Sequence, residues 1–199
     1  MAHDWGAIVA WRFAIRRARP LARLVIMNVP HPACFAREIG TWKQLKKSWY
    51  VFFFQIPWLP ERLMAARQGE AIRRAFVDMA IDKARFPVAV TDEFRRNALE
   101  PGALTAMINY YRAAMRTRTK ATTPQPDTVD TPTLMIWGLE DTALDRATTV
   151  GTDKYVKDLT LRYLPGVSHW VQQEAPEKVN TIIEAWLQGG PVPIEGEIV

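Results

Sequence analysis

The first residues of the chain have the types and spacing of a reactive carboxylate on a sharp turn. Ala2-His3-Asp4-Trp5-Gly6 is a small-x-acid-x-small pattern. It is typical of a nucleophile elbow, a strained turn from strand to helix that pushes one side chain outward. Small residues are needed because the turn brings backbone and neighbouring side chains close together. A carboxylate there attacks a saturated, electrophilic carbon and forms an ester that water must cleave. The plainer alternative is that Asp4 only caps the following helix.

Two later segments contain the partners that such a carboxylate needs. An apolar run at residues 133–137 leads through a Gly turn to Asp141, and a second short strand leads to Gly-Val-Ser-His, which ends at His169. We expect both side chains at strand ends, where loops carry catalytic groups. In this interpretation His169 takes a proton from water and Asp141 holds its tautomer. The structural alternatives are a packed core histidine and a solvent-facing turn acid, and Glu140 competes with Asp141 for the role.

Six stretches, spread over nearly the whole chain, resemble the epoxide hydrolase branch of the α/β-hydrolase superfamily. They are HDWGAIVAW (3–11), NVPHP (28–32), FFFQIPWLPE (52–61), NYYR (109–112), WGLEDTAL (137–144) and GVSHWVQQEAPE (166–177). The chain order nucleophile, acid, histidine also matches. The resemblance implies an α/β fold, here a partial α/β-hydrolase fold with a mostly parallel sheet and an inserted helical lid. It implies that water opens a small apolar epoxide to a vicinal diol through an ester on Asp4.

The resemblance also implies the groups that assist ring opening. In epoxide hydrolases two lid tyrosines point at the nucleophile, and the matching positions are Tyr50 and Tyr111. The ring oxygen is a poor leaving group, and a phenol with a pKa of about 10 can hydrogen-bond and protonate it. Tyr110 would face about 100° away on a helix, so only one of the pair points at the site. The backbone N–H of Trp5 is expected to form half of an oxyanion hole. Core packing is the alternative role of each tyrosine.

Hydrophobic periodicity and breaker residues predict an α/β core interrupted by helices. The expected division places residues 1–30 and 121–199 in the α/β-hydrolase core and residues 31–120 in the helical lid. The expected strands are 24–27, 133–137 and 159–164. The expected helices are 6–19, 35–47, 61–67, 70–82, 92–99, 103–117, one near 144–152, and 176–187. A proline-containing linker, 121–132, leads back to the core.

Composition narrows the function classes. The chain has 199 residues, 48% of them hydrophobic, which suits one globular domain. A single Cys34 and three scattered histidines predict no disulfide framework, metal or cofactor, and the lone cysteine fits a reducing, cytoplasmic location. The net charge of +5 comes without a nucleic-acid-binding module, so we expect no nucleic-acid partner. The apolar run 51–59 is too short for a membrane span, and no signal peptide is visible.

Two alternatives stay open at this point. Haloalkane dehalogenases share an aspartate nucleophile but bind halide with Trp or Asn N–H donors, which Trp5, Trp49 and Trp58 could supply. The tyrosines favour the epoxide hydrolase, and an aspartate at the elbow disfavours a serine esterase. The second alternative is an inactive fragment. The resemblance implies further strands and a His-Gly-x-Pro loop before the elbow, yet three residues precede Asp4. The expectation is therefore a C-terminal part with impaired activity that self-associates through an exposed sheet edge.

Overall fold

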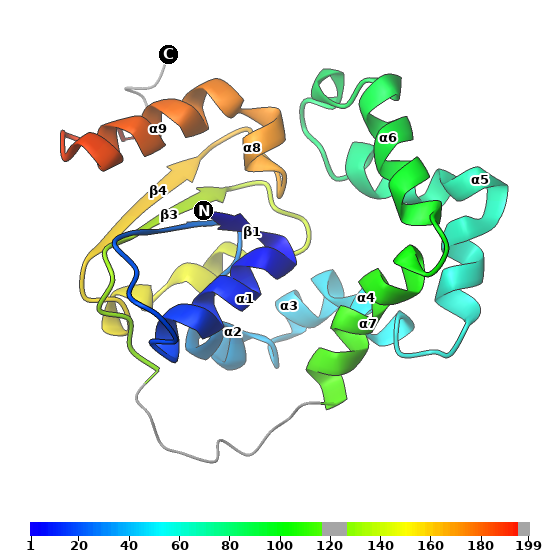
Figure 1. Ribbon diagram of the computed structural model, residues 1–199, viewed down its shortest axis with the longest axis horizontal. Helices are drawn as coiled ribbons and strands as arrows, with labels where there is room; N and C mark the ends of the chain where they lie inside the picture. Colours follow the sequence, from blue (N-terminus) through cyan, green and yellow to red (C-terminus); the bar gives the residue numbers. More distant parts are fainter. Residues whose placement is uncertain (117–126, 195–199) are drawn as a thin grey trace.

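A four-stranded parallel sheet forms the centre of the protein (Figure 1). The computed structural model describes residues 1–116 and 127–194. The strands lie in the order β1-β2-β3-β4, with bounds Ala2–His3, Leu24–Met27, Thr133–Gly138 and Leu159–Leu164. The predicted bounds of β2 and β4 are confirmed, and β3 continues one residue further. The two-residue β1 was not predicted, because two residues are too few to show a pattern.

Helices cover both faces of the sheet, which explains why β2 and β3 are apolar without alternation. Every residue of β2 and β3 is buried. One face packs on α1 (Asp4–Ile15), where Trp11 meets Ile26 and Trp137. The other face packs on α8 (Val171–Glu174) and α9 (Pro176–Gln188). Burying one such large side chain contributes about 1.5–3 kcal/mol, so these two layers fix the strand ends in place.

In the described residues between β2 and β3 (28–116 and 127–132), six α-helices follow one another without an intervening strand. They are α2 (Pro32–Glu38), α3 (Trp42–Lys47), α4 (Trp49–Phe53), α5 (Leu59–Val77), α6 (Val88–Leu99) and α7 (Ala103–Arg116). A short 3-10 helix, Lys83–Arg85, joins α5 to α6. Figure 1 shows α5, α6 and α7 standing apart from the sheet, on the side to which the strand arrows point. The predicted break between 67 and 70 is present, because residues 66–69 of α5 have non-helical backbone angles.

Several predicted helices have different bounds: α6 begins at Val88 rather than at 92, and α5 ends at Val77 rather than at 82. The prediction of a single helix over 35–47 is wrong. Helix α2 ends at Glu38, and a new helix, α3, begins after Thr41, whose hydroxyl caps it. The helix near 144–152 is also wrong: two 3-10 turns, Arg146–Thr149 and Thr152–Lys154, replace it on either side of Gly151, which has a φ of +80°. The helix predicted over 6–19 spans Asp4–Ile15, because the backbone turns left-handed at Arg17. Residues 121–126 of the predicted linker, and Thr117, lie outside the described residues.

In the parts of the chain that the structure describes, no helix combines the length and the apolar character that crossing a bilayer requires. The same parts contain no group of three His, Cys, Asp or Glu side chains arranged to hold a metal ion.

Candidate active site

Asp4 lies at the tip of a strained turn between β1 and α1. Its φ is 47°, the left-handed region that a side chain normally avoids. Such backbone costs about 1–3 kcal/mol and is tolerated where the surrounding structure enforces it. His3, not Asp4, is the N-cap residue of α1, and no side chain caps this helix. A Cβ on Gly6 would meet nothing within 4 Å, so the crowding expected there is absent from the described structure.

The side chains of Asp4, His169 and Asp141 form a continuous line. The Nδ1 atom of His169 lies 2.7 Å from Oδ2 of Asp141, and its Nε2 atom lies 3.5 Å from Oδ1 of Asp4. Asp141 and His169 are buried, whereas the Asp4 side chain is 43% exposed. Glu140, the competing acid, instead accepts a hydrogen bond from the backbone of Val167. The arrangement joins one accessible carboxylate to one buried carboxylate through a single imidazole.

Asn28, which the sequence analysis did not single out, holds Asp141 in place. Its Nδ2 atom donates to Oδ2 of Asp141 at 2.7 Å, and its Oδ1 accepts from the Gly138 N–H at 3.0 Å. The other carboxylate oxygen of Asp141 accepts from the backbone of Ala143 and Leu144 at 2.7 and 2.8 Å. Asn28 follows the apolar strand β2 directly and has a φ of 46°. A polar residue in that position was the signal that could have found it.

The backbone brings the Asp141 loop and the His169 loop unusually close. A Cβ on Gly138 would lie 2.1 Å from the carbonyl oxygen of Ser168, so only glycine fits at the end of β3. The elbow is tied to the same loop, because the His3 ring donates to the His169 carbonyl oxygen at 2.8 Å. Burial lowers the pKa of His3 to about 4, and the ring is therefore neutral at pH 7.

Helix α3 supports the segment that follows Asp141. The buried Gln44 side chain donates to the Ala143 carbonyl at 3.0 Å and accepts from the Asp145 N–H at 2.9 Å. One turn later, Lys47 donates to the backbone carbonyl of Asp141 at 2.5 Å. These contacts cross about a hundred residues of sequence, so local patterns gave no sign of them.

The charges in this line favour an imidazolium between two carboxylates. Burial lowers the pKa of His169, but Asp141 and then Asp4 outweigh it and hold that pKa well above its ordinary value. Burial raises the pKa of Asp4, yet His169 and a hydrogen bond from the Trp5 N–H bring it below its ordinary value. The same balance with His169 and Asn28 lowers the pKa of Asp141. Both acids are therefore ionised at neutral pH.

Two half-buried phenols lie beside Asp4. The rings of Tyr50 and Tyr111 are 5.7 Å apart, and the Tyr111 ring packs edge-on against Trp5 at 4.8 Å. Burial, followed by the negative charge of Asp4, raises the pKa of Tyr111 to about 12, and burial also raises that of Tyr50. Both hydroxyls remain protonated donors at neutral pH. The neighbouring Tyr110 is 51% exposed.

A buried ion pair fixes the backbone around these phenols. Arg112, next to Tyr111, donates to Glu61 at 2.5 and 3.0 Å and to the carbonyls of Phe54 and Ile56 at 2.9 Å. Gln55 adds a hydrogen bond to the Tyr111 carbonyl at 3.3 Å. These contacts join α7 to the turn between α4 and α5. Both motifs are visible in the sequence, but the pairing of Arg112 with Glu61 is not.

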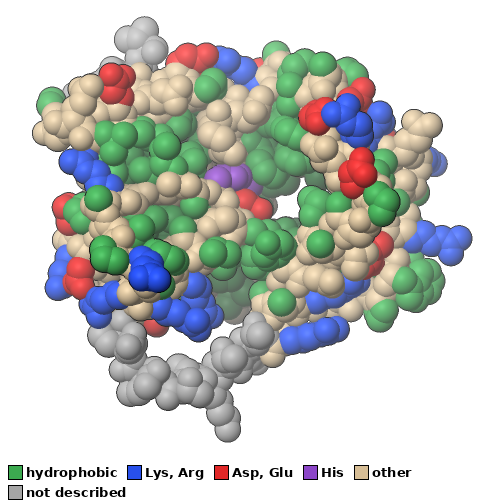
Figure 2. All heavy atoms as spheres, in the orientation of Figure 1, with side chains coloured by type: hydrophobic (Ala, Val, Ile, Leu, Met, Phe, Trp, Pro, Cys, Tyr) green, Lys and Arg blue, Asp and Glu red, His purple; other side chains and the backbone are tan. Residues whose placement is uncertain are grey.

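The site opens on the side of the molecule that faces the α4–α7 helices. Figure 2 shows histidine and acidic side chains in a gap between the part with the sheet and these helices, with hydrophobic side chains around them. An apolar molecule could reach the exposed carboxylate from this gap.

Comparisons with known proteins identify the family of the chain. The alpha/beta hydrolase family matches residues 1–182. Epoxide hydrolase 1 of Caenorhabditis elegans is 36% identical over 193 residues, which are 94% of this chain and 47% of that protein. Epoxide hydrolase 3 of Xenopus tropicalis is 34% identical over 94% of this chain and 52% of that protein. The chain thus spans about half the length of the curated relatives it matches.

Solved structures of epoxide hydrolases superpose on this chain. The epoxide hydrolase of Bacillus megaterium, crystallised with an inhibitor, superposes with a TM-score of 0.82 at 27% identity, over 94% of this chain and 67% of that one. The epoxide hydrolase VrEH1 of Vigna radiata superposes with a TM-score of 0.74 at 22% identity, over 94% and 67%, and shows the shared fold. The chain therefore belongs to the alpha/beta hydrolase family and resembles its epoxide hydrolases.

Proposed function

We propose that the protein hydrolyses small apolar epoxides to vicinal diols through an ester on Asp4. The observation that carries the proposal is the line from Asp4 through His169 to Asp141, with two protonated phenols beside its exposed end. The resemblance to epoxide hydrolases supports the same reaction. We also propose that residues 31–120 act as the lid and that residues 1–30 and 121–199 act as the core.

The first step forms the ester. An Asp4 oxygen attacks an epoxide carbon, the carbon–oxygen bond of the ring breaks, and Tyr50 or Tyr111 gives its proton to the leaving oxygen. A raised phenol pKa keeps the proton available until the alkoxide forms. His169 then returns a proton to the tyrosinate through solvent and becomes neutral.

Ester formation itself prepares the second step. The negative charge of Asp4 helps to hold the proton on His169, and esterification removes that charge. The neutral His169 then takes a proton from water, which attacks the ester carbonyl while the Trp5 N–H stabilises the oxyanion. Collapse of this intermediate releases the diol and restores ionised Asp4 and protonated His169. Asp141 stabilises the imidazolium throughout.

The haloalkane dehalogenase alternative has less support from the geometry. A halide site needs buried N–H donors, yet the side chains of Trp49 and Trp58 are 64% and 65% exposed. Trp5 packs against Tyr111. The inactive fragment stays the second alternative, and measured turnover decides it.

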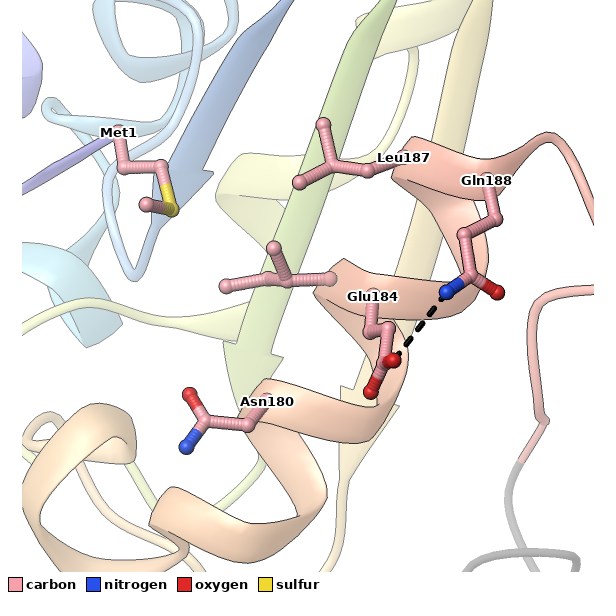
Figure 3. A pocket seen from close by; sticks show the side chains of 6 residues that line it. Met1, Asn180, Glu184, Leu187 and Gln188 are labelled. Atoms are coloured by element: carbon pink, nitrogen blue, oxygen red, sulfur yellow. Dashed lines mark hydrogen bonds between the residues drawn. The ribbon is translucent and has the colours of Figure 1, made fainter.

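We further propose that the chain self-associates at the β1 edge of the sheet. Within residues 1–116 and 127–194, β1 pairs only with β2. An apolar hollow beside it is lined by Met1, Ile183 and Leu187, and Figure 3 shows Leu187 projecting from α9 toward this hollow. Val9 of α1 is 57% exposed. Strand edges and apolar patches of this kind favour association.

The buried Cys34, which forms no disulfide, supports a cytoplasmic location.

The test compares two activities and two tyrosine variants. The protein should release a diol from a terminal aryl epoxide and no chloride from a chloroalkane. Tyr50→Phe with Tyr111→Phe should slow ring opening by about 10²–10⁴-fold, the contribution of a general acid. The exposed neighbour gives the matched control, because Tyr110→Phe should change little. Chloride release at a comparable rate, or full activity of the double variant, would overturn the assignment.

A further inference from the structure

Glu174 receives hydrogen bonds from two segments that are far apart in the sequence. Its Oε1 atom accepts from the backbone N–H of Ser168, at 3.1 Å, and from the Ser168 hydroxyl. Its Oε2 atom accepts from the N–H groups of Ile81 and Asp82, at 2.9 and 3.1 Å. The residue is only 5% exposed. One buried carboxylate thus joins the residue before His169 to the connection between α5 and α6.

The two segments also meet at contacts that leave Ser168 untouched. Gln173 donates to the Arg85 carbonyl at 2.9 Å, and Arg85 donates twice to Glu177 at 3.1 Å on the molecular surface. The ring of Phe76 lies 4.7 Å from that of Trp170. Residues 76–86 are therefore seated on the segment that starts directly after His169.

We propose that Glu174 is a positioning residue that makes the placement of His169 depend on whether residues 81–82 are seated. When residues 81–82 leave, two acceptor positions of a buried carboxylate lose their donors, which is unfavourable. Glu174 then shifts or takes up water, and Ser168 loses the contact that fixes its backbone. His169 must reach Asp141 at 2.7 Å and Asp4 at 3.5 Å, so a small movement of Ser168 breaks the line.

Two variants on the same stretch of chain separate this role from simple packing. An amide has one acceptor oxygen, so in Glu174→Gln one pair of donors loses its acceptor whichever way the side chain turns. Glu177→Gln makes the same chemical change three residues later. It weakens the contact with Arg85 but does not touch Ser168, and it is the matched control.

The first readouts need no substrate. We expect the pKa of His169, followed by NMR, to fall in Glu174→Gln toward its ordinary value of about 6.5 and to stay unchanged in Glu177→Gln. Amide hydrogen exchange should accelerate together at Ser168 and at Ile81 and Asp82 in the first variant. Faster exchange at only one of the two segments, or an unchanged His169 pKa, would overturn the proposal.

The kinetic consequence rests on the proposed function. Glu174→Gln should slow ester hydrolysis by about 10²-fold, the cost of a misplaced catalytic group, and should slow ester formation much less. A protein without turnover that still shows the NMR and exchange changes would refute the proposed function and keep the positioning role. If Glu174→Gln does not fold, Ser168→Ala replaces it, because it keeps the charge of Glu174. It should shift the His169 pKa less and in the same direction, and no shift would contradict the proposal.

Discussion

At the scale of residues, the charge of His169 depends on what surrounds it. Two carboxylates raise its pKa before the reaction, and esterification of Asp4 would remove one of them. Asp141 is the partner that stays charged in both steps. It is also fully hydrogen-bonded by Asn28 and by the backbone of Ala143 and Leu144, so its position does not depend on the reaction.

Asp141→Asn should therefore slow ester hydrolysis far more than any change at the neighbouring acid. The amide cannot stabilise an imidazolium, and loss of such a charge lowers turnover by about 10⁴-fold in a comparable triad. Glu140→Gln, which alters only a contact with Val167, is the control and should remain close to the parent. Single-turnover kinetics with a terminal epoxide measures the rate of ester hydrolysis in the two variants. Equal losses would contradict the assignment of Asp141 as the acid that supports His169.

Local sequence patterns predicted the residues of this line but not their supports. Asp4, Asp141 and His169 each stand in a recognisable motif next to a strand end. Asn28 and Glu174 act through hydrogen bonds to residues 113 and 93 positions away. Periodicity carries no information about such contacts, which arise only when the sheet and the helices have packed.

At the scale of elements, strands with two buried faces were the easiest to predict. The apolar run of β2 has the predicted bounds because burial on both faces leaves a continuous pattern. β4 also has the predicted bounds, although five of its six residues are only half-buried. The segment after Asp141 was predicted as a helix because strands and helices alternate in this part of the chain, yet Asp145 and Gly151 shape it into 3-10 turns. There the contacts made by Gln44 outweigh local propensity.

The buried ion pair between α7 and α5 should be worth more than an exposed one. Arg112→Met leaves Glu61 partly buried without its partner, which should lower the free energy of unfolding by about 3 kcal/mol. Arg96→Met removes an exposed pair with Glu93 on α6 and should cost less than about 1 kcal/mol. Urea titrations compare the two. Similar losses in the two variants would contradict the larger contribution of the ion pair between Arg112 and Glu61.

The N-cap of α2 should make stability depend on acid. Nδ1 of the buried His31 accepts from the Ala33 N–H, and burial lowers the pKa of His31 to about 4. The unfolded chain, with a pKa of about 6.5, binds the proton first, so stability should fall as the pH drops from about 6.5 to 4. His31→Asn keeps a capping group that does not titrate. Thermal melts should show a shallower pH dependence in this variant, whatever its stability at pH 7. An equal slope would exclude His31 as the cause.

At the scale of the whole molecule, β1 and β4 are the two edge strands of the sheet in the described structure. β1 is an edge strand, and Met1, Ile183 and Leu187 place apolar surface next to it. The order of β2, β3 and β4, with the helices between β2 and β3, followed from the sequence, because clear breakers separate the apolar runs. An exposed sheet edge was predicted from the resemblance to epoxide hydrolases, and no local sequence pattern indicated it.

Val9→Lys should reduce self-association without disturbing the site. Val9 is 57% exposed on α1, the helix that follows β1, and a charge there opposes apolar contact between copies. Sedimentation velocity over a wide range of concentrations should show association of the parent and a weaker tendency of the variant. Arg19→Lys, on the loop beyond α1, is a neutral control. A parent that remains monomeric throughout would refute the interface.

The most direct test of the account is to look for the ester itself. His169→Gln removes the base that activates water, so an epoxide that has reacted with Asp4 should remain attached. Mass spectrometry of the digested variant should find one added epoxide on the peptide that contains Asp4, and Asp4→Asn in the same background should abolish it. An adduct on another residue, or none on a protein whose parent form makes diol, would contradict the assignment of Asp4 as nucleophile.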